Sequence, residues 1–307
     1  MRRREFLAAL GIAPLIAAAT RHIGRARFSF ITDEAATSPA EAIAFAHKYG
    51  LQWIELRDVP GGKKGHYYKQ PEEDLKAAAK EFQDNGLKVS FFNTPFLKIT
   101  LPGTEPLRRK PEAPEQHEKR IAAHQAEFDR RTEDLKQGIR AAHILGVDLL
   151  RVFTFQRVQE PESQFQRIAD ILGEMSLVAE KESIHLIVEN EGSCNVATTP
   201  ELAGIIKLLP KSVGLNWDPH NAFSYKEIAY PDAYKVLPID RTRNVQTKGK
   251  SLLEPDQKFD WAGIFHALDR DGYGGKIGLE THYFDGTRVE KSHLAMQEML
   301  RITESAS

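Results

Sequence analysis

The sequence predicts an α/β fold in the form of a (β/α)8 TIM barrel. Eight short apolar runs alternate with helical patterns between residues 27 and 302, and no linker interrupts the alternation. Parallel strands need crossover helices, and eight such units close a barrel. A doubly wound open sheet is the alternative. Its nucleotide-binding versions lose their usual signature, because no G-x-G-x-x-G follows the first strand and no G-x-x-x-x-G-K-[ST] is present.

The expected strands are apolar runs that end in polar or turn-forming residues. They cover, in order, residues 28–31, 53–56, 88–92, 148–153, 184–188, 213–217, 243–247 and 277–279. The seventh is the least apolar of the eight.

The expected helices follow proline or capping residues and stop at glycine or asparagine. They cover residues 38–46, 71–85, 119–145, 161–183, 199–208, 260–268 and 289–302. Asp260 is the expected N-cap of the sixth helix. Residues 93–118 are rich in proline and charge, and we expect them to form an irregular excursion over one face of the domain.

Composition restricts the partners. The chain has 307 residues, of which 41% are hydrophobic and 28% charged, and its formal net charge is -1. This balance removes the general electrostatic reason to expect nucleic acid or an anionic membrane and favours a small polar partner. Cys194 is the only cysteine. A disulfide within the chain and a thiolate metal cluster are therefore excluded, and any metal must be held by oxygen and nitrogen.

The first residues are typical of an export signal. Three arginines at positions 2–4 precede an apolar run that ends in Ala17-Ala18-Ala19, and Arg3-Arg4-x-Phe6-Leu7 resembles a twin-arginine motif. We predict a signal peptide over residues 1–19 and one domain over 20–307. The mature protein is expected to be periplasmic or otherwise exported, without stable membrane association. A basic helix that packs on the domain is the other interpretation.

Polar residues follow four apolar strands at their C-terminal ends. Side chains two positions apart share a strand face, so Glu189 pairs with Glu191, Asp218 with His220, Gln246 with Lys248, and Glu280 with His282. We expect Glu189, Asp218, Gln246 and Glu280 to converge as the inner members. Three carboxylates in a site of low dielectric must be protonated or hold a cation. Oxygen ligands of this kind suit Mg²⁺, Mn²⁺, Co²⁺ or Zn²⁺.

These strand ends resemble those of the xylose isomerase-like barrels, a family of sugar isomerases and epimerases. The resemblance is carried by Val188-Glu189-Asn190, the Asp218 tip and Gly278-Leu279-Glu280. It implies a metal set of Glu189, Asp218 and Glu280, with both glutamates moving protons. The family's His-x-Lys-Asp motif is Gln246-Thr247-Lys248-Gly249 here, and its histidine three residues after the aspartate is Asn221. Gln246 through its amide oxygen, or His220, would then complete the site.

The chemistry expected of such a site is proton transfer next to a carbonyl through an enediolate. Glu189 and Glu280 are the predicted acid–base pair, and Lys248 adds positive charge near the developing oxyanion. A carbohydrate is the expected substrate. The candidate substrate-binding residues are Glu55, Arg57, His66, Glu191, Asn221 and His282. The oligomeric state is not predicted.

The sequence leaves two other functions open and disfavours a third. The same enediolate next to a leaving group would make the protein a lyase or hydratase acting on oxidised (3-keto) glycosides. The altered seventh strand allows a carbohydrate-binding barrel without catalysis. Apurinic-site endonucleases share the fold, but they need more strand-end histidines and a basic DNA groove, neither of which is evident in the sequence.

Overall fold

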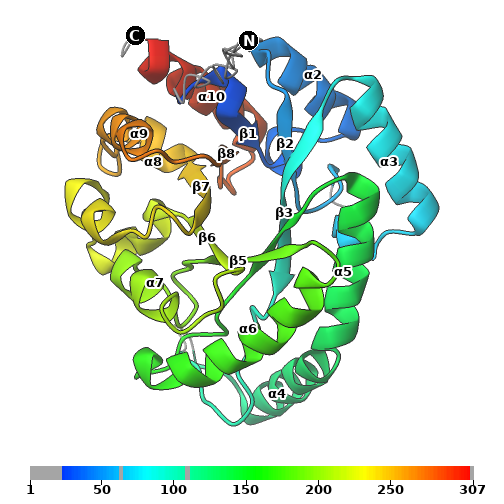
Figure 1. The fold of residues 1–307 in the computed structure, drawn as a ribbon, viewed down its shortest axis with the longest axis vertical. Coiled ribbons are helices and arrows are strands. Elements are labelled where there is room, and N and C mark those ends of the chain that lie inside the picture. The colour runs from blue at the N-terminus through cyan, green and yellow to red at the C-terminus, as the bar shows by residue number, and fades with distance from the viewer. Residues whose placement is uncertain (1–22, 62–64, 108–110, 305–307) are drawn as a thin grey trace, which may run out of the picture.

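The computed structural model describes residues 23–61, 65–107 and 111–304. Eight parallel strands form one sheet in the order β1-β8-β7-β6-β5-β4-β3-β2, with helices around the outside (Figure 1). The predicted TIM barrel is therefore confirmed. The predicted signal peptide over residues 1–19 lies outside the described residues and stays a prediction.

The strands match the predicted runs closely. They are β1 (Phe28–Phe30), β2 (Trp53–Leu56), β3 (Lys88–Phe96), β4 (Leu149–Val152), β5 (His185–Glu189), β6 (Gly214–Trp217), β7 (Thr242–Lys248) and β8 (Lys276–Glu280). The helices are α1 (Thr32–Ala35), α2 (Pro39–Tyr49), α3 (Glu72–Asp84), α4 (Pro114–Asp129), α5 (Arg131–Leu145), α6 (Phe165–Glu180), α7 (Thr199–Ile205), α8 (Gly249–Leu253), α9 (Trp261–Arg270) and α10 (Arg288–Glu304). Asp260 caps α9 as expected, accepting a hydrogen bond from the Gly263 amide.

Three segments differ from the prediction. The long helix expected up to residue 145 is two helices, because Arg130 between α4 and α5 leaves the helical conformation with ψ of 0°. Strand β3 runs on to Phe96 through Pro95, where its pairing with β4 is irregular, so the lost proline N–H interrupts no regular ladder. Between β6 and β7 the chain begins with η4, a 3-10 helix over Pro219–Tyr225.

The barrel closes at a narrow seam between its first two strands. β1 pairs along its length with β8, and β2 pairs with β3. Across the seam itself the structure records one parallel bridge, between Ile31 and Glu55. The sheet is therefore a nearly closed barrel.

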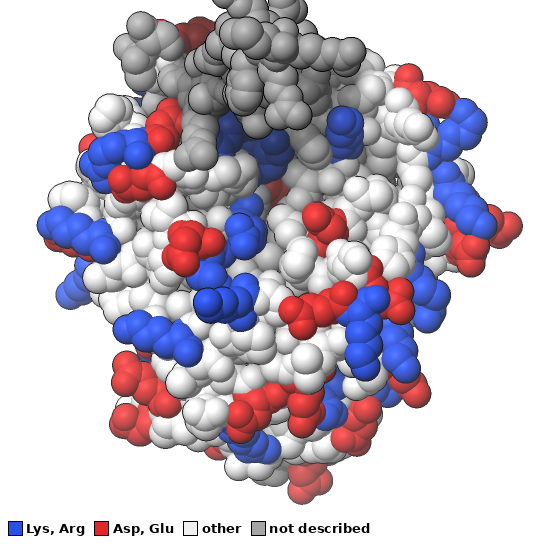
Figure 2. Space-filling model, viewed as in Figure 1, with Lys and Arg blue, Asp and Glu red and all other residues white. Residues whose placement is uncertain are grey.

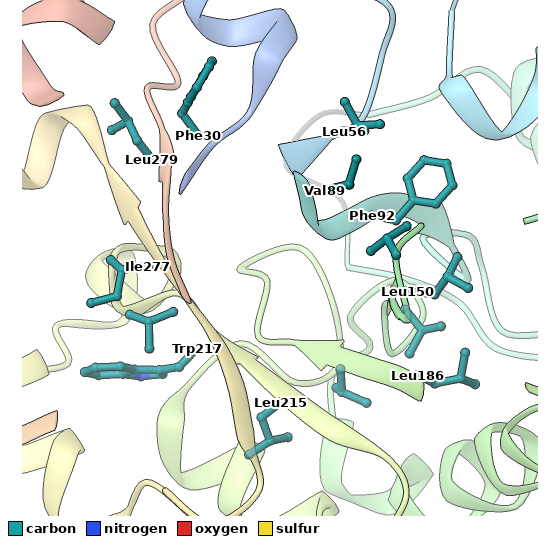
Figure 3. Packing of buried hydrophobic residues seen from close by; sticks show 14 of the residues in the cluster. Phe30, Leu56, Val89, Phe92, Leu150, Leu186, Leu215, Trp217, Ile277 and Leu279 are labelled. Atoms are coloured by element: carbon teal, nitrogen blue, oxygen red, sulfur yellow. The ribbon is translucent and has the colours of Figure 1, made fainter. Parts of the chain in front are cut away.

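Apolar and polar side chains alternate along the strands. Leu150, Leu186, Leu215 and Ile277 pack into a hydrophobic core that they share with the surrounding helices (Figure 3). The residues between them project into the barrel, where many are polar. Asn244 of β7 hydrogen-bonds Glu55 of β2, which is not its neighbour in the sheet, so this contact crosses the barrel interior. Polar side chains that could take part in a reaction therefore lie inside the barrel.

Charges of both signs are interspersed over the face of the molecule seen in Figure 2. This mixture agrees with the formal net charge of -1. Within residues 23–61, 65–107 and 111–304, no helix combines the length and apolar character needed to cross a membrane.

Candidate active site

Three buried carboxylates meet at the C-terminal ends of the strands. Glu189 ends β5, Asp218 follows β6, and Glu280 ends β8. One oxygen from each lies within 4.8 Å of the others, and all three side chains are buried. The structure thus brings together three of the four residues expected to converge.

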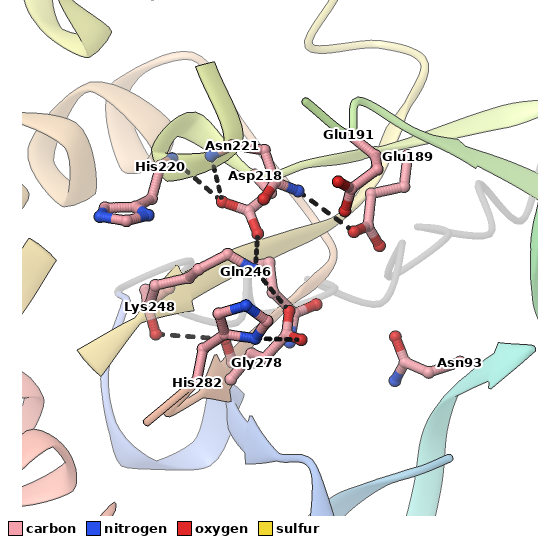
Figure 4. A network of polar contacts seen from close by, with 12 residues as sticks. Asn93, Glu189, Glu191, Asp218, His220, Asn221, Gln246, Lys248, Gly278 and His282 are labelled. Carbon is pink, nitrogen blue, oxygen red and sulfur yellow. Dashed lines mark hydrogen bonds and ion pairs between the residues drawn. The ribbon is translucent and has the colours of Figure 1, made fainter. Parts of the chain in front are cut away.

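The Lys248 ammonium lies among these carboxylates (Figure 4). Its nitrogen is 2.8 Å from Glu280 Oε2, to which it donates a hydrogen bond, and 2.9 Å from Asp218 Oδ2. The second contact is an ion pair without hydrogen-bond alignment. Lys248 is buried and ends β7, directly opposite Glu280 in the register of β7 and β8. The sequence placed Lys248 near a reacting oxygen, and the structure shows it bound to the carboxylates themselves.

Lys248, Glu280 and Asp218 strongly shift one another's pKa values. Burial lowers the pKa of Lys248, but Asp218 and Glu280 outweigh it and hold this pKa above its ordinary value. Burial raises the pKa of Glu280, yet Lys248, His282 and Arg57 together keep it well below the ordinary range. For Asp218 burial dominates, and its pKa lies above the ordinary value despite Lys248. At neutral pH the site therefore contains an ammonium beside an ionised Glu280.

Glu189 is held by two neighbours that the sequence reasoning did not select. Arg151 Nη1 lies 3.0 Å and Asn216 Nδ2 2.7 Å from Glu189 Oε2. Arg151 also donates to the Thr94 and Asn93 carbonyl oxygens, at 3.1 and 3.2 Å, so its position is fixed. A signal was present, since Arg151 is a charged residue in an otherwise apolar strand, and such a residue is rarely buried without a partner.

Arg57 links Glu280 to two further acids. Its guanidinium lies 3.2 Å from Glu280 Oε1, 2.6 Å from Asp33 Oδ2 and 2.8 Å from Glu34 Oε1. Asp33 and Glu34 follow β1 in α1, and both are buried. They were visible at the tip of the first strand but were not selected. Arg57, predicted to contact substrate, is engaged by three carboxylates in this structure.

A second polar layer lies below the carboxylates. Glu55 is fully buried and accepts hydrogen bonds from Ser29, Asn93, Gln246 and Asn244 at 2.8, 2.9, 3.2 and 3.3 Å. The Gln246 amide oxygen faces Asn244 and Asn216, at 3.2 and 3.4 Å. Gln246, the expected fourth metal ligand, thus belongs to this lower layer, and Glu55, the expected substrate contact, is enclosed in it.

The His220 ring faces away from the carboxylates. Its Nε2 lies 3.0 Å from Gln257 Oε1, and the ring stacks on Phe223 with centroids 5.6 Å apart. Burial lowers the pKa of His220 to about 4. Pro219 starts the η4 helix here, so the two-residue alternation that paired His220 with Asp218 no longer applies. The Asp218 side chain instead caps the start of η4, where its Oδ1 accepts a hydrogen bond from the His220 backbone N–H at 3.0 Å.

The remaining candidates surround the carboxylates at different distances from the centre. Asn221 donates its backbone N–H to Asp218 Oδ1 at 3.2 Å and its amide to Glu189 Oε1 at 3.4 Å. His282 Nδ1 lies 3.4 Å from Glu280 Oε1. Glu191 pairs with Lys98 at 3.1 Å. His66 pairs with Asp58 at 2.5 Å in the segment after β2, and no contact joins it to the three carboxylates.

The carboxylates alone form a set that could bind a metal ion, and a second such set is Glu34, Glu280 and His282. Two observations count against the metal site that the resemblance implies. The expected fourth ligands, Gln246 and His220, are engaged elsewhere, and the Lys248 ammonium contacts two of the three carboxylates. The residues of this chain therefore do not complete that site in the described arrangement.

Comparison with known proteins gives the family. The model of the xylose isomerase-like TIM barrel family matches residues 43–305. No curated protein matches this sequence.

Solved structures share the fold at low identity. A D-psicose 3-epimerase from Clostridium cellulolyticum H10, solved with D-tagatose, is 12% identical with a TM-score of 0.64, over 91% of this chain and 98% of the other. A probable 3-DHS dehydratase from Bacillus anthracis is 13% identical with a TM-score of 0.65, over 90% and 98%. The IOLI protein with a bound zinc atom is 16% identical with a TM-score of 0.64, over 92% and 99%. With the family match, these similarities show that the chain belongs to the xylose isomerase-like TIM barrel family.

Proposed function

We propose that this protein is a carbohydrate isomerase or epimerase that transfers a proton next to a carbonyl through an enediolate. The observation that carries the proposal is that two buried glutamates, Glu189 and Glu280, have oxygens within 4.8 Å of each other and that Glu280 contacts a buried ammonium within the barrel. Members of this family are mostly sugar isomerases, epimerases and related enzymes, including a dehydratase.

Each residue has a role in the proposed step. One glutamate takes the proton from the carbon beside the carbonyl, and the electron pair moves to the carbonyl oxygen. An ammonium has three N–H donors, and two protein partners of Lys248 are seen among the described residues. A remaining N–H is therefore available to the developing oxyanion. The other glutamate must hold a proton at this point, which it returns to the opposite face of the carbon, and the proton taken by the first glutamate stays on it until it exchanges with water.

The low pKa of Glu280 is compatible with a role as base. In the free site Lys248 stabilises the ionised carboxylate, which weakens it as a proton acceptor. When Lys248 turns toward a substrate oxygen, Glu280 loses part of this stabilisation and its proton affinity rises. Substrate binding and activation of the base are thus coupled through one ammonium group.

The proposal is tested by deuterium uptake from heavy water into a panel of keto sugars and 3-keto glycosides, followed by nuclear magnetic resonance. We expect deuterium next to the carbonyl together with an isomer or epimer. An unsaturated product with a released group would establish the lyase alternative. Binding without exchange would establish a carbohydrate-binding barrel. The Glu189→Gln/Glu280→Gln double variant controls for uncatalysed exchange.

We also propose that the mature protein is exported, on the basis of the Arg3-Arg4-x-Phe6-Leu7 pattern and the apolar run that follows. Deleting residues 2–7 is expected to leave the protein in the cytoplasm as an uncleaved precursor, because the basic segment that such a system reads is lost. Cell fractionation and the mass of the fractionated protein measure this. Unchanged export would contradict the proposal.

A further inference from the structure

We infer that the Lys248 ammonium is the resident cation of this site and takes the place of the divalent metal ion that the family resemblance implies. The assignment of the site as catalytic rests on the proposed function, but the occupation of the site by Lys248 does not.

Every oxygen of the three carboxylates already lies against an N–H donor or a cation, and Asp218 Oδ2 has an ion pair alone. Asp218 Oδ1 accepts from two backbone N–H groups, and its Oδ2 lies 2.9 Å from the Lys248 ammonium. Glu280 Oε2 lies 2.8 Å from the same ammonium, and Oε1 lies 3.2 Å from Arg57. Glu189 Oε2 accepts from Arg151 at 3.0 Å, and Oε1 from Asn221 at 3.4 Å. A metal ion would have to displace these donors to reach its ligands.

Three cations already lie against the three carboxylates. Glu189 has Arg151, Glu280 has Arg57, and Lys248 lies between Asp218 and Glu280. Arg57 is shared with the neighbouring Asp33 and Glu34. A divalent ion added beside a buried ammonium would meet strong repulsion, because the field of Lys248 is poorly screened in the interior. Lys248 is 3% exposed and extends from the last residue of β7, so it does not escape to solvent without rearrangement.

The seventh strand supplies the ammonium in place of an imidazole. Gln246, at the position of the family's histidine, turns into the lower layer and donates to Glu55 at 3.2 Å. Lys248, two residues on, shares its strand face and reaches the carboxylates. The second set of possible ligands, Glu34, Glu280 and His282, is likewise occupied, because Arg57 contacts both of its glutamates.

Binding of Mn²⁺ to the purified protein, measured by titration calorimetry and by electron paramagnetic resonance, tests the inference. We expect the wild type to bind Mn²⁺ at this site at least about 100-fold more weakly than Lys248→Met, which keeps the length of the side chain and removes the competing charge. The gain should be lost in Lys248→Met/Asp218→Asn. Lys235→Met, which removes an exposed lysine, is the matched control and should bind like the wild type.

Two results would overturn the inference. The first is one equivalent of Mn²⁺ bound tightly by the wild type and lost in Asp218→Asn. The second is a folded Lys248→Met variant that binds Mn²⁺ no better than the wild type. The wild-type titration decides even where Lys248→Met fails to fold, as judged by circular dichroism. These readouts do not depend on turnover, so inactivity toward every carbohydrate tested would remove the proposed function and leave this inference standing.

Discussion

Replacing either glutamate of the proposed pair by glutamine is expected to reduce turnover by about 10²–10⁴-fold, because an amide neither accepts nor returns the proton. Glu189 and Glu280 end different strands, β5 and β8. If each glutamate acts on one face of the substrate carbon, Glu189→Gln should still exchange the proton of one epimer for deuterium, and Glu280→Gln should still exchange that of the other. Deuterium uptake from heavy water into each pure epimer, measured by nuclear magnetic resonance, tests this expectation.

A matched control is Glu115→Gln, which changes an exposed glutamate paired with Lys119 on α4 and should leave exchange unchanged. Thermal unfolding of both active-site variants separates lost chemistry from lost structure, since Glu189→Gln leaves Arg151 without its buried carboxylate. Full exchange from both epimers in both folded variants would remove the acid–base assignment.

Gly278→Ala is expected to cost about 3 kcal/mol of unfolding free energy or to prevent folding, the largest stability effect predicted for this protein. A Cβ atom at Gly278 would lie 1.8 Å from Glu55 Oε1 and 2.6 Å from its Cδ. Glu55 cannot move aside freely, because four buried side chains hydrogen-bond its carboxyl group. Urea unfolding measures the change. Gly274→Ala is the control, since a Cβ there would meet nothing within 4 Å.

A double-mutant cycle shows whether Glu55 causes the cost. Glu55→Ala removes the carboxyl group with which the new methyl group collides, so Gly278→Ala should cost less in that background, by about 0.5–3 kcal/mol. An equal cost of Gly278→Ala in both backgrounds would show that the destabilisation arises elsewhere. The cycle compares differences only, so the loss caused by Glu55→Ala itself does not affect the conclusion.

Sequence periodicity was sufficient to predict the barrel, because most strands form short, largely apolar runs and most helices have clear start and stop signals. Even the weakly apolar seventh run is a strand, β7. The break at Arg130 could not be read, since the helical pattern continues through it and the interruption depends on the local backbone. The 3-10 helix after Asp218 was also missed, although Pro219 marks its start.

The acidic residues of the site could be predicted from the sequence, but the level in the barrel at which each side chain lies could not. Alternation placed Gln246 and Lys248 on one strand face correctly, but it carries no information on the stagger between neighbouring strands. That stagger sets Lys248 level with Glu280 and Gln246 level with Gly278. Alternation also ends where the strand ends. His282 has a φ of 56°, in the left-handed region, so its direction could not follow from its distance to Glu280.

At the seam between β1 and β2, the ion pairs of one arginine both help to close the barrel and form part of the candidate active site. One backbone bridge among the described residues, between Ile31 and Glu55, crosses the seam. Next to it Arg57, which follows β2, forms ion pairs with Asp33 and Glu34, which follow β1. The same guanidinium holds Glu280. Arg57 therefore joins α1, which follows the first strand, to the end of the last strand. A change that breaks these ion pairs is therefore expected to alter both the environment of Glu280 and the closure of the barrel between β1 and β2.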